Sequence, residues 1–514
     1  MLTHGRRHFQ LCAIALVLLT IVIRLPSLLH PQAIDDEAIY SVVANEIVDG
    51  GLPYRDAIER KPPLLFWTYA AVFEVAGKYN WMALHAVALA WTLGTMAGLY
   101  AIGRHLFNRE TGLIAALLYG VFQSWAVAKN LAFNGEMLMN LPLVWAWYIA
   151  FKASSSRLRP ELFGAGLLLG AGFLLKQPAA IAAVPVGIYL LLPSYRMSRG
   201  ITKSISFAQA AMLTAGFFAA LALVAMVLAR EGILGEAFYW TFTNHDIPRV
   251  FWETGILHTL AFIGACLPLV VGAGMAFRDR KELWATRKPE RTALLGLLVA
   301  SVIGAAAGAR FYPHYYIQLV PPLALLAAPH YVQLWGSRTR PRFWLFRPAV
   351  MVGWMTLTVA AFSISHWKFL ARERKSSSMA RYLMEHSAPD DRIFIWGRSS
   401  AQFYLKARRR PASRYILTFP LTGLVFGDDL PGLDTRDRIV PGAWDKLEQD
   451  FRKHPPVFIV DLDPGPHAQY PLHDFPMLAK LLAEHYALVA QPGRNLVFKY
   501  DSKILVPHAL ITGF

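Results

Sequence analysis

Three acidic residues, Asp35, Asp36 and Glu37, follow the first apolar segment of the chain. A carboxylate within hydrogen-bond reach of a hydroxyl group can take its proton as the oxygen attacks. If a helix begins at Asp36, the charges lie in its first turn, where the helix dipole favours them. Helix capping in a solvated loop would produce the same pattern. Because the acids adjoin an apolar segment and basic residues follow in the same loop, we favour a chemical role.

A lysine and two prolines, Lys61-Pro62-Pro63, come later in this loop, before the apolar stretch 64–69. A residue that precedes proline avoids the helical region, so Lys61 is predicted to lie on an extended turn. The stretch that follows is too short to span a bilayer and is predicted to lie in the interface. An ammonium group presented there suits a lipid phosphate. A lysine that only snorkels to the interface is the alternative.

Four more charged residues, Glu136, Lys176, Arg310 and His314, lie near the ends of apolar segments. A carboxylate at membrane depth is costly without a partner. Glu136 could therefore bind a divalent cation together with Asp36 or orient an acceptor, and a simple helix N-terminal acid explains it equally well. Lys176 could contact a phosphate or snorkel. Arg310 and His314 stand among tyrosines, where interfacial anchoring is the alternative to phosphate binding.

Other patterns of charged residues do not support a metal site or a nucleotide-sugar site. His245 and Asp246 lack further spaced ligands, so they do not support a metal site. Asp461 and Asp463 have the spacing found in nucleotide-sugar enzymes, but turn formation at a strand end explains them better. The sequence contains no Walker motif and no glycine fingerprint for nucleotides. The sequence therefore does not indicate a nucleotide-binding site.

The composition indicates a membrane protein. Of the 514 residues, 55% are hydrophobic and 17% are charged, whereas soluble proteins carry roughly 25% charge. The formal net charge of +17 comes mostly from short loops between apolar segments, so retention of positive charge on the cytoplasmic side explains it better than nucleic-acid binding does. The two cysteines, Cys12 and Cys266, lie in apolar segments and are predicted to pack there.

About eleven membrane spans are predicted from apolar runs of suitable length. They lie at about 9–29, 81–103, 111–128, 136–152, 161–176, 178–193, 206–229, 255–277, 292–309, 314–335 and 344–368. Basic residues concentrate in alternate loops, which the positive-inside rule places in the cytoplasm. The N-terminus is then cytoplasmic, and the chain after about residue 370 lies outside.

Near residue 376 the long apolar segments end, and shorter predicted strands and helices follow. Strands are predicted at 391–397, 456–461 and 496–500, and helices at 399–407, 444–454 and 475–485. Alternating strands and helices indicate a small α/β domain. We therefore predict a polytopic α-helical membrane domain over residues 1–370, with the acids in its outer loop 30–80, and a periplasmic α/β domain over residues 376–514.

Several short motifs together resemble a known family. They are Asp36-Glu37-Ala38-Ile39-Tyr40, Gly50-Gly51, Lys61-Pro62-Pro63-Leu64 with Trp67, Asn134-Gly135-Glu136, Lys176-Gln177-Pro178, and His314-Tyr315 before Pro321-Pro322. In order and membrane placement they resemble the bacterial GT-C glycosyltransferases. More narrowly, they resemble the protein O-mannosyltransferase-like group that includes the lipid A aminoarabinose transferase and the rhizobial galacturonosyltransferases. The likeness covers roughly the first 340 residues.

The resemblance implies an enzyme of the bacterial inner membrane. Such enzymes take a sugar from a polyprenyl phosphate on the periplasmic face and transfer it, usually with inversion, to a hydroxyl or phosphate. It assigns Asp36 as the catalytic base with Glu37 beside it, and Glu136 matches the second acidic position of the family. A divalent cation is left open, because members of the group differ in metal dependence. The predicted partners are the lipid-linked sugar, a glycolipid or glycan acceptor and the bilayer, with no nucleic acid.

The leaving group is a phosphate diester that becomes a monoester, so it needs positive charge more than a proton. Lys61 is the first candidate to supply that charge, followed by Arg310, His314 and Lys176. Among acceptors, lipid A or the lipopolysaccharide core is favoured over another envelope glycan or a secreted protein.

Two other functions were weighed. A transporter or flippase of a lipid-linked saccharide would use the same charged residues for binding only. Transporters tend to place charges near the bilayer midplane, whereas here the charges cluster at span ends, which favours an enzyme. A scaffold that binds envelope partners through the C-terminal domain would leave the loop acids without a role.

Overall fold

The computed structural model describes residues 2–34, 36–125, 128–153, 159–244, 251–278, 283–336, 348–373, 378–397, 399–424, 434–462, 470–491 and 495–501. It divides into two compact units, each assembled from separate stretches of the chain. The first, called here the helical unit, comprises Met1–Ile34, Trp81–Leu228 and Val250–Ala371. The second, the mixed unit, comprises Asp35–Asn80, Ala229–Arg249 and Arg372–Phe514. Asp35 itself lies outside the described residues.

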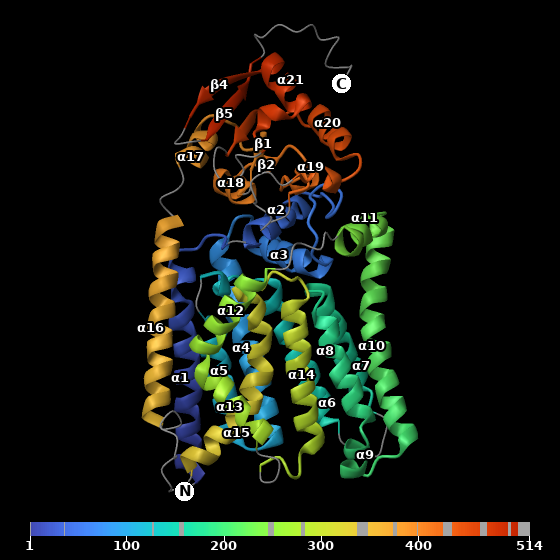
Figure 1. Cartoon of the computed structure of the whole chain (residues 1–514), viewed down its shortest axis with the longest axis vertical. Helices are drawn as coiled ribbons and strands as arrows, with labels where there is room; N and C mark the ends of the chain where they lie inside the picture. The colour runs from blue at the N-terminus through green and yellow to red at the C-terminus, as the bar shows by residue number, and fades with distance from the viewer. Residues whose placement is uncertain are drawn as a thin grey trace. The chain divides into compact units, whose positions relative to one another are not determined.

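Long apolar helices that run side by side make up the helical unit (Figure 1). The helices of this unit are α1 (Leu2–Leu29), α4 (Trp81–Leu106), α5 (Arg109–Phe122), α6 (Gly135–Lys152), α7 (Glu161–Leu175), α8 (Ala179–Leu191), the short α9 (Pro193–Arg199), α10 (Lys203–Arg230), α12 (Trp252–Ala265), α13 (Leu267–Arg278), α14 (Lys288–Ala306), α15 (Val320–Gly336) and α16 (Pro348–Glu373), with the short turns η1 (Ala128–Leu131) and η3 (Pro313–Leu319). Helix α4 packs against α5 and α6, and α15 packs against α5 and α13.

Small residues let two of these helices approach closely. Gly166 of α7 faces the backbone of α10 near Leu213 and Gly216, and a methyl group at either glycine would collide with the opposite backbone. Small residues at helix crossings are the usual means of tight packing in membranes. This contact ties α7, which leads to Lys176, to the long apolar helix α10.

Five described helices are long and apolar enough to cross a membrane, or seven if each of two bent helix pairs counts as one span. The prediction of about eleven spans is therefore not confirmed. The four remaining predicted spans contain α5, α6, α7 and α15, which have 14 to 18 residues. At 1.5 Å per residue such helices are about 21 to 27 Å long, less than the hydrocarbon core of about 30 Å. The chain is nonetheless a mostly helical, multi-pass membrane protein.

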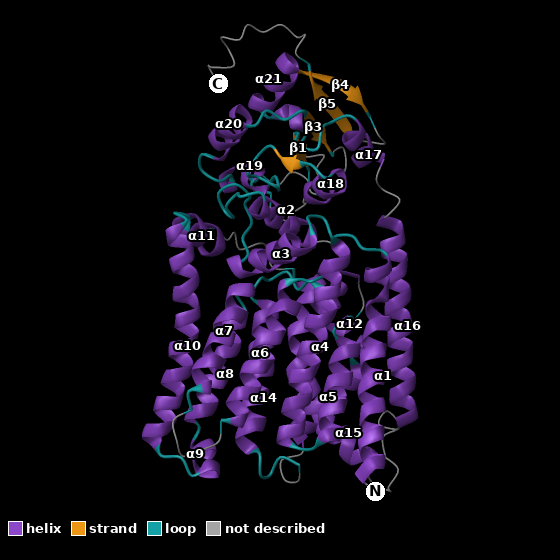
Figure 2. Ribbon diagram, turned by 180° about the vertical axis from the view of Figure 1, so that it is seen from behind, coloured by secondary structure: helices purple, strands orange, loops and turns teal. Residues whose placement is uncertain are grey.

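The mixed unit combines two helices from the loop after α1 with a five-stranded sheet (Figure 2). Its elements are α2 (Asp36–Val48), α3 (Pro63–Ala76), α11 (Leu234–Phe238), η2 (Tyr239–Thr243), α17 (Ser378–Glu385), β1 (Arg392–Trp396), α18 (Ser400–Ala407), β2 (Arg410–Pro411), α19 (Phe419–Thr422), η5 (Arg436–Arg438), α20 (Ala443–Lys453), β3 (Phe458–Asp461), η6 (Leu472–Asp474), α21 (Pro476–His485), β4 (Tyr486–Ala490) and β5 (Leu496–Tyr500). Helix α2 packs against α3 and against α18.

The strand order in the sheet is β2-β1-β3-β5-β4. Strands β2, β1 and β3 are parallel, whereas β5 is antiparallel to both β3 and β4. The predicted strands near 391–397, 456–461 and 496–500 are present as β1, β3 and β5. Neither β2, which has only two residues, nor β4 was predicted from the sequence. The boundaries of the two predicted domains, at residues 370 and 376, stay a prediction.

Candidate active site

Two acids, Asp36 and Glu37, occupy the first turn of α2, because the helix begins at Asp36. The side chain of Asp36 is half-buried, whereas Glu37 is 0% exposed. Negative charge in the first turn interacts favourably with the helix dipole. The two neighbouring carboxylates therefore differ in access, and only Asp36 is open to a further molecule.

A buried tyrosine of α3, Tyr69, lies within electrostatic reach of both acids. Burial raises the pKa of Tyr69 well above its usual value, and the charges of Glu37 and Asp36 raise it further. Its ring packs edge-on against Tyr40 of α2, with 5.7 Å between the centroids. The hydroxyl group thus stays protonated, which is the form that can donate a hydrogen bond to a carboxylate.

Lys61 stands at the start of α3, where Pro63 occupies the first turn. Proline suits this position because its missing N–H would have no helical partner there. The hydroxyl of Tyr54 donates a hydrogen bond of 2.7 Å to the Lys61 carbonyl, which holds the backbone. The ammonium is 3.5 Å from the buried carboxylate of Glu59, and the side chain is 26% exposed. It therefore remains accessible to an anion.

The helical unit brings three of the predicted site residues together. The Glu136 carboxylate oxygen Oε1 lies 2.7 Å from Nζ of Lys176 and 3.9 Å from Nε2 of His314. All three side chains are at least nine-tenths buried. The other carboxylate oxygen of Glu136, Oε2, makes no hydrogen bond to the described part of the chain. A buried carboxylate oxygen without a partner is uncommon and is satisfied when a donor binds there.

The local sequence explains how this group forms. Asn134 caps α6 by accepting a hydrogen bond from the Met137 amide, which sets Glu136 in the first turn. Gly135 leaves room for the lysine, because a methyl group there would come within 2.5 Å of Cδ of Lys176. Lys176 follows the last residue of α7 with extended backbone angles, so its side chain leaves the helix.

Tyrosines of η3 and the residues before it surround this group. The rings of Tyr312 and Tyr315 lie against His314, at 5.9 and 4.6 Å between centroids. The ammonium of Lys176 lies 5.1 Å from the centroid of Tyr315, and that of Lys129 lies 5.3 Å from Tyr312. Cations over aromatic faces are stabilised by the ring quadrupole. The cluster thus holds more cationic groups than carboxylates.

Arg310 stands in a tight turn before η3. Its neighbours Ala309 and Phe311 both have left-handed backbone angles, with φ of 52° and 50°. The turn is held by the Phe251 amide, which donates to the Ala309 carbonyl, and by His258, whose Nδ1 lies 2.8 Å from the Phe311 carbonyl. Strained backbone of this kind persists only where its surroundings enforce it, and it clusters at functional sites. Arg310 itself is half-buried.

Among the described residues, no three His, Cys, Asp or Glu side chains form a group that could hold a metal ion. The predicted pairing of Asp36 with Glu136 on a cation stays an open prediction, and within the helical unit the partner of Glu136 is Lys176. His245, Asp246 and Asp463 lie outside the described residues. Asp461 is the buried last residue of β3.

Sequence reasoning missed three residues near these groups: Tyr69, Glu59 and Lys129. Lys129 could have been noticed, because it is a basic residue in a short loop on the predicted outer side, where positive charge is otherwise scarce. Glu59 stands two residues before Lys61, which is a weak indication of pairing. Nothing in the spacing of Tyr69 relates it to Asp36, since only the packing of α3 against α2 brings them together.

Residues 60–235 match a family model described as dolichyl-phosphate-mannose-protein mannosyltransferase. This segment contains Lys61, Glu136 and Lys176, and it ends before Arg310 and His314. No curated protein matches the chain.

Solved structures share the fold over nearly the whole chain. ArnT from Cupriavidus metallidurans bound to undecaprenyl phosphate has a TM-score of 0.61 at 12% identity, covering 99% of this chain and 100% of that one. Its apo state gives 0.61 at 13% identity over 98% and 99%. The Archaeoglobus fulgidus oligosaccharyltransferase in complex with zinc and sulfate gives 0.52 at 13% identity, covering 97% and 74%. The family match over residues 60–235 and these structural matches agree with the resemblance drawn from the sequence, and they show that the chain shares the fold of these structures.

Proposed function

We propose that the protein transfers a sugar from a polyprenyl phosphate to a hydroxyl or phosphate group of an envelope acceptor, with inversion. With a hydroxyl acceptor, Asp36 takes the proton as its oxygen attacks the anomeric carbon. The bond from that carbon to the phosphate oxygen breaks, and the polyprenyl phosphate leaves as a monoester with one more negative charge. Glu37, buried beside Asp36, supports the base.

The observation that carries this proposal is the placement of the charged residues at helix ends. Asp36 begins α2, Glu136 lies in the first turn of α6, and Lys176 follows the last residue of α7. A transporter of a lipid-linked saccharide would be expected to carry such charges near the middle of its spans. Charges at helix ends instead suit chemistry at the membrane surface.

The cationic side chains suit the donor phosphate. Lys61 is accessible in the mixed unit. In the helical unit, Lys176, His314 and Arg310 provide further positive charge beside the ring of Tyr315 and its neighbours. ArnT from Cupriavidus metallidurans binds undecaprenyl phosphate, and we propose a donor of the same class here. The unpaired oxygen of Glu136 would accept a hydrogen bond from a sugar or acceptor hydroxyl.

We further propose that the enzyme resides in a bacterial inner membrane with its active site facing the periplasm. Lipid A or the lipopolysaccharide core is the favoured acceptor. A secreted protein is the alternative, because the description of the matching family names a protein acceptor.

The test is a deletion strain that expresses either the wild-type protein or Asp36→Asn, with envelope lipids and glycans compared by mass spectrometry. We expect the wild type to restore one sugar modification and Asp36→Asn to leave it missing, although the variant inserts normally. Asp56→Asn is the matched control, because Asp56 is an exposed aspartate of the same loop whose carboxylate accepts a hydrogen bond from the Leu52 amide.

Full restoration by Asp36→Asn would show that the base is assigned wrongly. Accumulation of the lipid-linked sugar on the cytoplasmic side of the deletion strain would instead indicate a flippase.

A further inference from the structure

Two arginines begin neighbouring parallel strands of the mixed unit. Arg392 is the first residue of β1 and Arg410 the first of β2, and the two are register partners. Their side chains therefore leave the sheet next to each other. Arg392 also donates a hydrogen bond of 2.7 Å to the Pro411 carbonyl, which fixes its direction.

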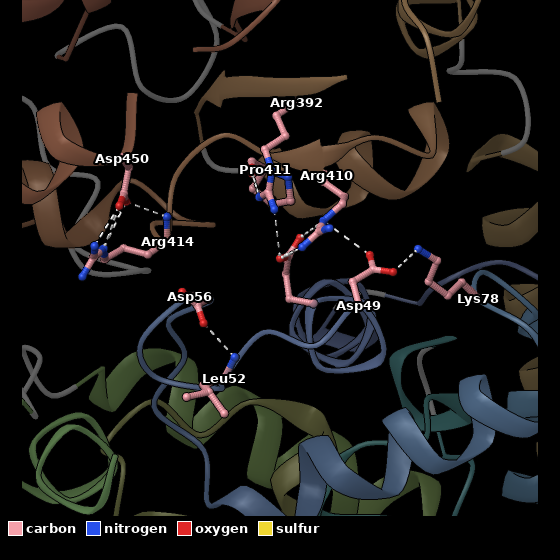
Figure 3. A network of polar contacts seen from close by, with 10 residues as sticks. Asp49, Leu52, Asp56, Lys78, Arg392, Arg410, Pro411, Arg414 and Asp450 are labelled. Atoms are coloured by element: carbon pink, nitrogen blue, oxygen red, sulfur yellow. Dashed lines mark hydrogen bonds and ion pairs between the residues drawn. The ribbon is translucent and has the colours of Figure 1, made fainter. Parts of the chain in front are cut away.

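Both arginines reach the same buried carboxylate of α2 (Figure 3). Arg410 holds Glu46 in a two-pronged contact, with Nε 2.9 Å from Oε1 and Nη2 2.5 Å from Oε2. Nη2 of Arg392 lies 3.7 Å from Oε2. A guanidinium that binds a carboxylate through two parallel hydrogen bonds restricts its orientation as well as its position.

The contact extends to the end of α2. Nε of Arg410 is also 3.3 Å from Asp49, which lies 2.6 Å from the ammonium of Lys78 (Figure 3). Helix α18, which connects β1 to β2, packs against α2 beside these charges. The C-terminal half of α2 is thus held by side chains that come from more than 340 positions later in the sequence, a separation of 364 for Glu46 and Arg410.

A second attachment lies next to Lys61. The Ile58 amide donates a hydrogen bond of 2.9 Å to the Arg414 carbonyl. The Arg414 side chain is itself held by Asp450, at 2.8 Å (Figure 3). The guanidinium of Arg60 stacks 3.9 Å over the ring of Phe419. These contacts fix the backbone on the N-terminal side of Lys61.

The two attachments act on the two residues of this loop that are proposed to be functional, Asp36 and Lys61. Glu46 and Asp36 are ten residues apart on one helix, about 15 Å at 1.5 Å per residue. A helix of this length moves as a rod, so a change of angle at Glu46 displaces the carboxylate of Asp36. The other attachment acts on Lys61, whose chain neighbours it holds.

We propose that Arg410, with Arg392, is a positioning residue that orients α2 and thereby the carboxylate of Asp36, while Phe419 and the Arg414 carbonyl position Lys61. This rests on the proposed function for the roles of Asp36 and Lys61. The C-terminal α/β segment is then an integral part of the active site and not an appendage to it.

The first test uses Arg410→Ala in the full-length protein. Transfer is followed in membrane vesicles from the complemented deletion strain, and the binding of undecaprenyl phosphate to the purified protein is measured in parallel. The transfer rate per folded enzyme should fall about 10- to 100-fold, because a misplacement of about 1 Å at a reacting group costs about 100-fold. The Kd for undecaprenyl phosphate should change less than about two-fold, because Lys61 keeps its own attachment.

Three comparisons separate positioning from a general loss of stability. Added guanidinium ion should restore transfer by Arg410→Ala. Arg410→Lys should keep only part of the rate, because an ammonium group cannot bind the carboxylate through two parallel hydrogen bonds. In an Asp36→Asn background, Arg410→Ala should cause no further loss of the residual rate. Arg436→Ala is the matched control, since Arg436 forms an exposed ion pair with Asp434 in the same segment.

The second test uses Phe419→Ala, which removes the ring under Arg60. It should weaken the binding of undecaprenyl phosphate by about two- to five-fold, in line with one cation–π contact, and leave the transfer rate at saturating donor within about two-fold. Arg410→Ala should therefore lower the transfer rate and leave donor binding nearly unchanged, whereas Phe419→Ala should weaken donor binding and leave the rate nearly unchanged.

The positioning role is wrong if Arg410→Ala keeps the wild-type rate per folded enzyme, or if its loss adds to that of Asp36→Asn. Full activity of Asp36→Asn would instead refute the assigned base. Because the binding of undecaprenyl phosphate and the rescue by guanidinium are measured independently of Asp36, the two failures are distinguishable.

Discussion

The carboxylate of Glu136 and the ammonium of Lys176 form a buried ion pair of 2.7 Å between the start of α6 and the end of α7. The lysine is the only charged partner at hydrogen-bond distance from that carboxylate in the described part of the chain, and His314 lies further away, at 3.9 Å. The pair therefore joins the two helix ends, and its ammonium is proposed to bind a phosphate.

Removal of one member of this pair should destabilise the protein. Lys176→Met leaves the Glu136 carboxylate buried without its main partner, which typically costs about 3–5 kcal/mol. The double variant Glu136→Gln/Lys176→Met should recover most of the loss, because no unpaired charge remains. Thermal unfolding in detergent measures both. Transfer should stay low in the double variant, and a fully active double variant would show that the pair is structural only.

Gly135→Ala should affect donor binding more than stability. The added methyl group would come within 2.5 Å of Cδ of Lys176, so the flexible lysine side chain must move and its ammonium with it. We expect binding of undecaprenyl phosphate to weaken about ten-fold, the equivalent of 1.4 kcal/mol. Gly164→Ala in α7 is the control, since a methyl group there meets nothing within 4 Å. Equal affinities for the two variants would contradict the role of Lys176.

Tyr69→Phe should slow transfer without changing its pH dependence. The pKa of Tyr69 is raised by burial and then by Glu37 and Asp36, so its hydroxyl remains protonated in the folded protein at and above pH 10. It therefore cannot lose its proton in the usual assay range. The rate should fall about 10- to 100-fold, as expected for the loss of one donor to a charged group at about 1.5–3 kcal/mol. A shift of the alkaline limb below pH 10 would exclude this explanation.

The two acids of α2 should differ in importance. Asp36→Asn removes the proposed base and should lower the rate by about 100- to 10,000-fold. Glu37→Gln keeps the shape of a fully buried side chain, and a loss of only about ten-fold is expected for a supporting group. Rates in membrane vesicles, corrected for the amount of folded protein, check the order. If Glu37→Gln is the more damaging change, the roles of the two residues are exchanged.

Much of the local structure could be predicted because it depends on short-range chemistry. The start of α2 at Asp36, the proline-initiated α3 and the cap of α6 at Asn134 follow from residues within a few positions of each helix end. The apolar strands β1 and β3 could be recognised from their composition, since parallel strands buried on both faces are nearly continuous hydrophobic runs. The number of membrane spans could not be predicted reliably, because an apolar run does not show where a helix bends or ends early.

The sequence by itself determined the class of protein and the identity of the charged residues at helix ends: Asp36, Lys61, Glu136 and Lys176. Only the tertiary structure decided which of them are partners. Lys176 and Glu136 are 40 positions apart and meet because α6 packs against α7. Tyr69 joins the acids through the packing of α3 on α2, and Arg410 reaches Glu46 across 364 positions. Such pairings have no periodicity in the sequence, because they depend on how separate elements pack and not on the spacing of residues within one of them.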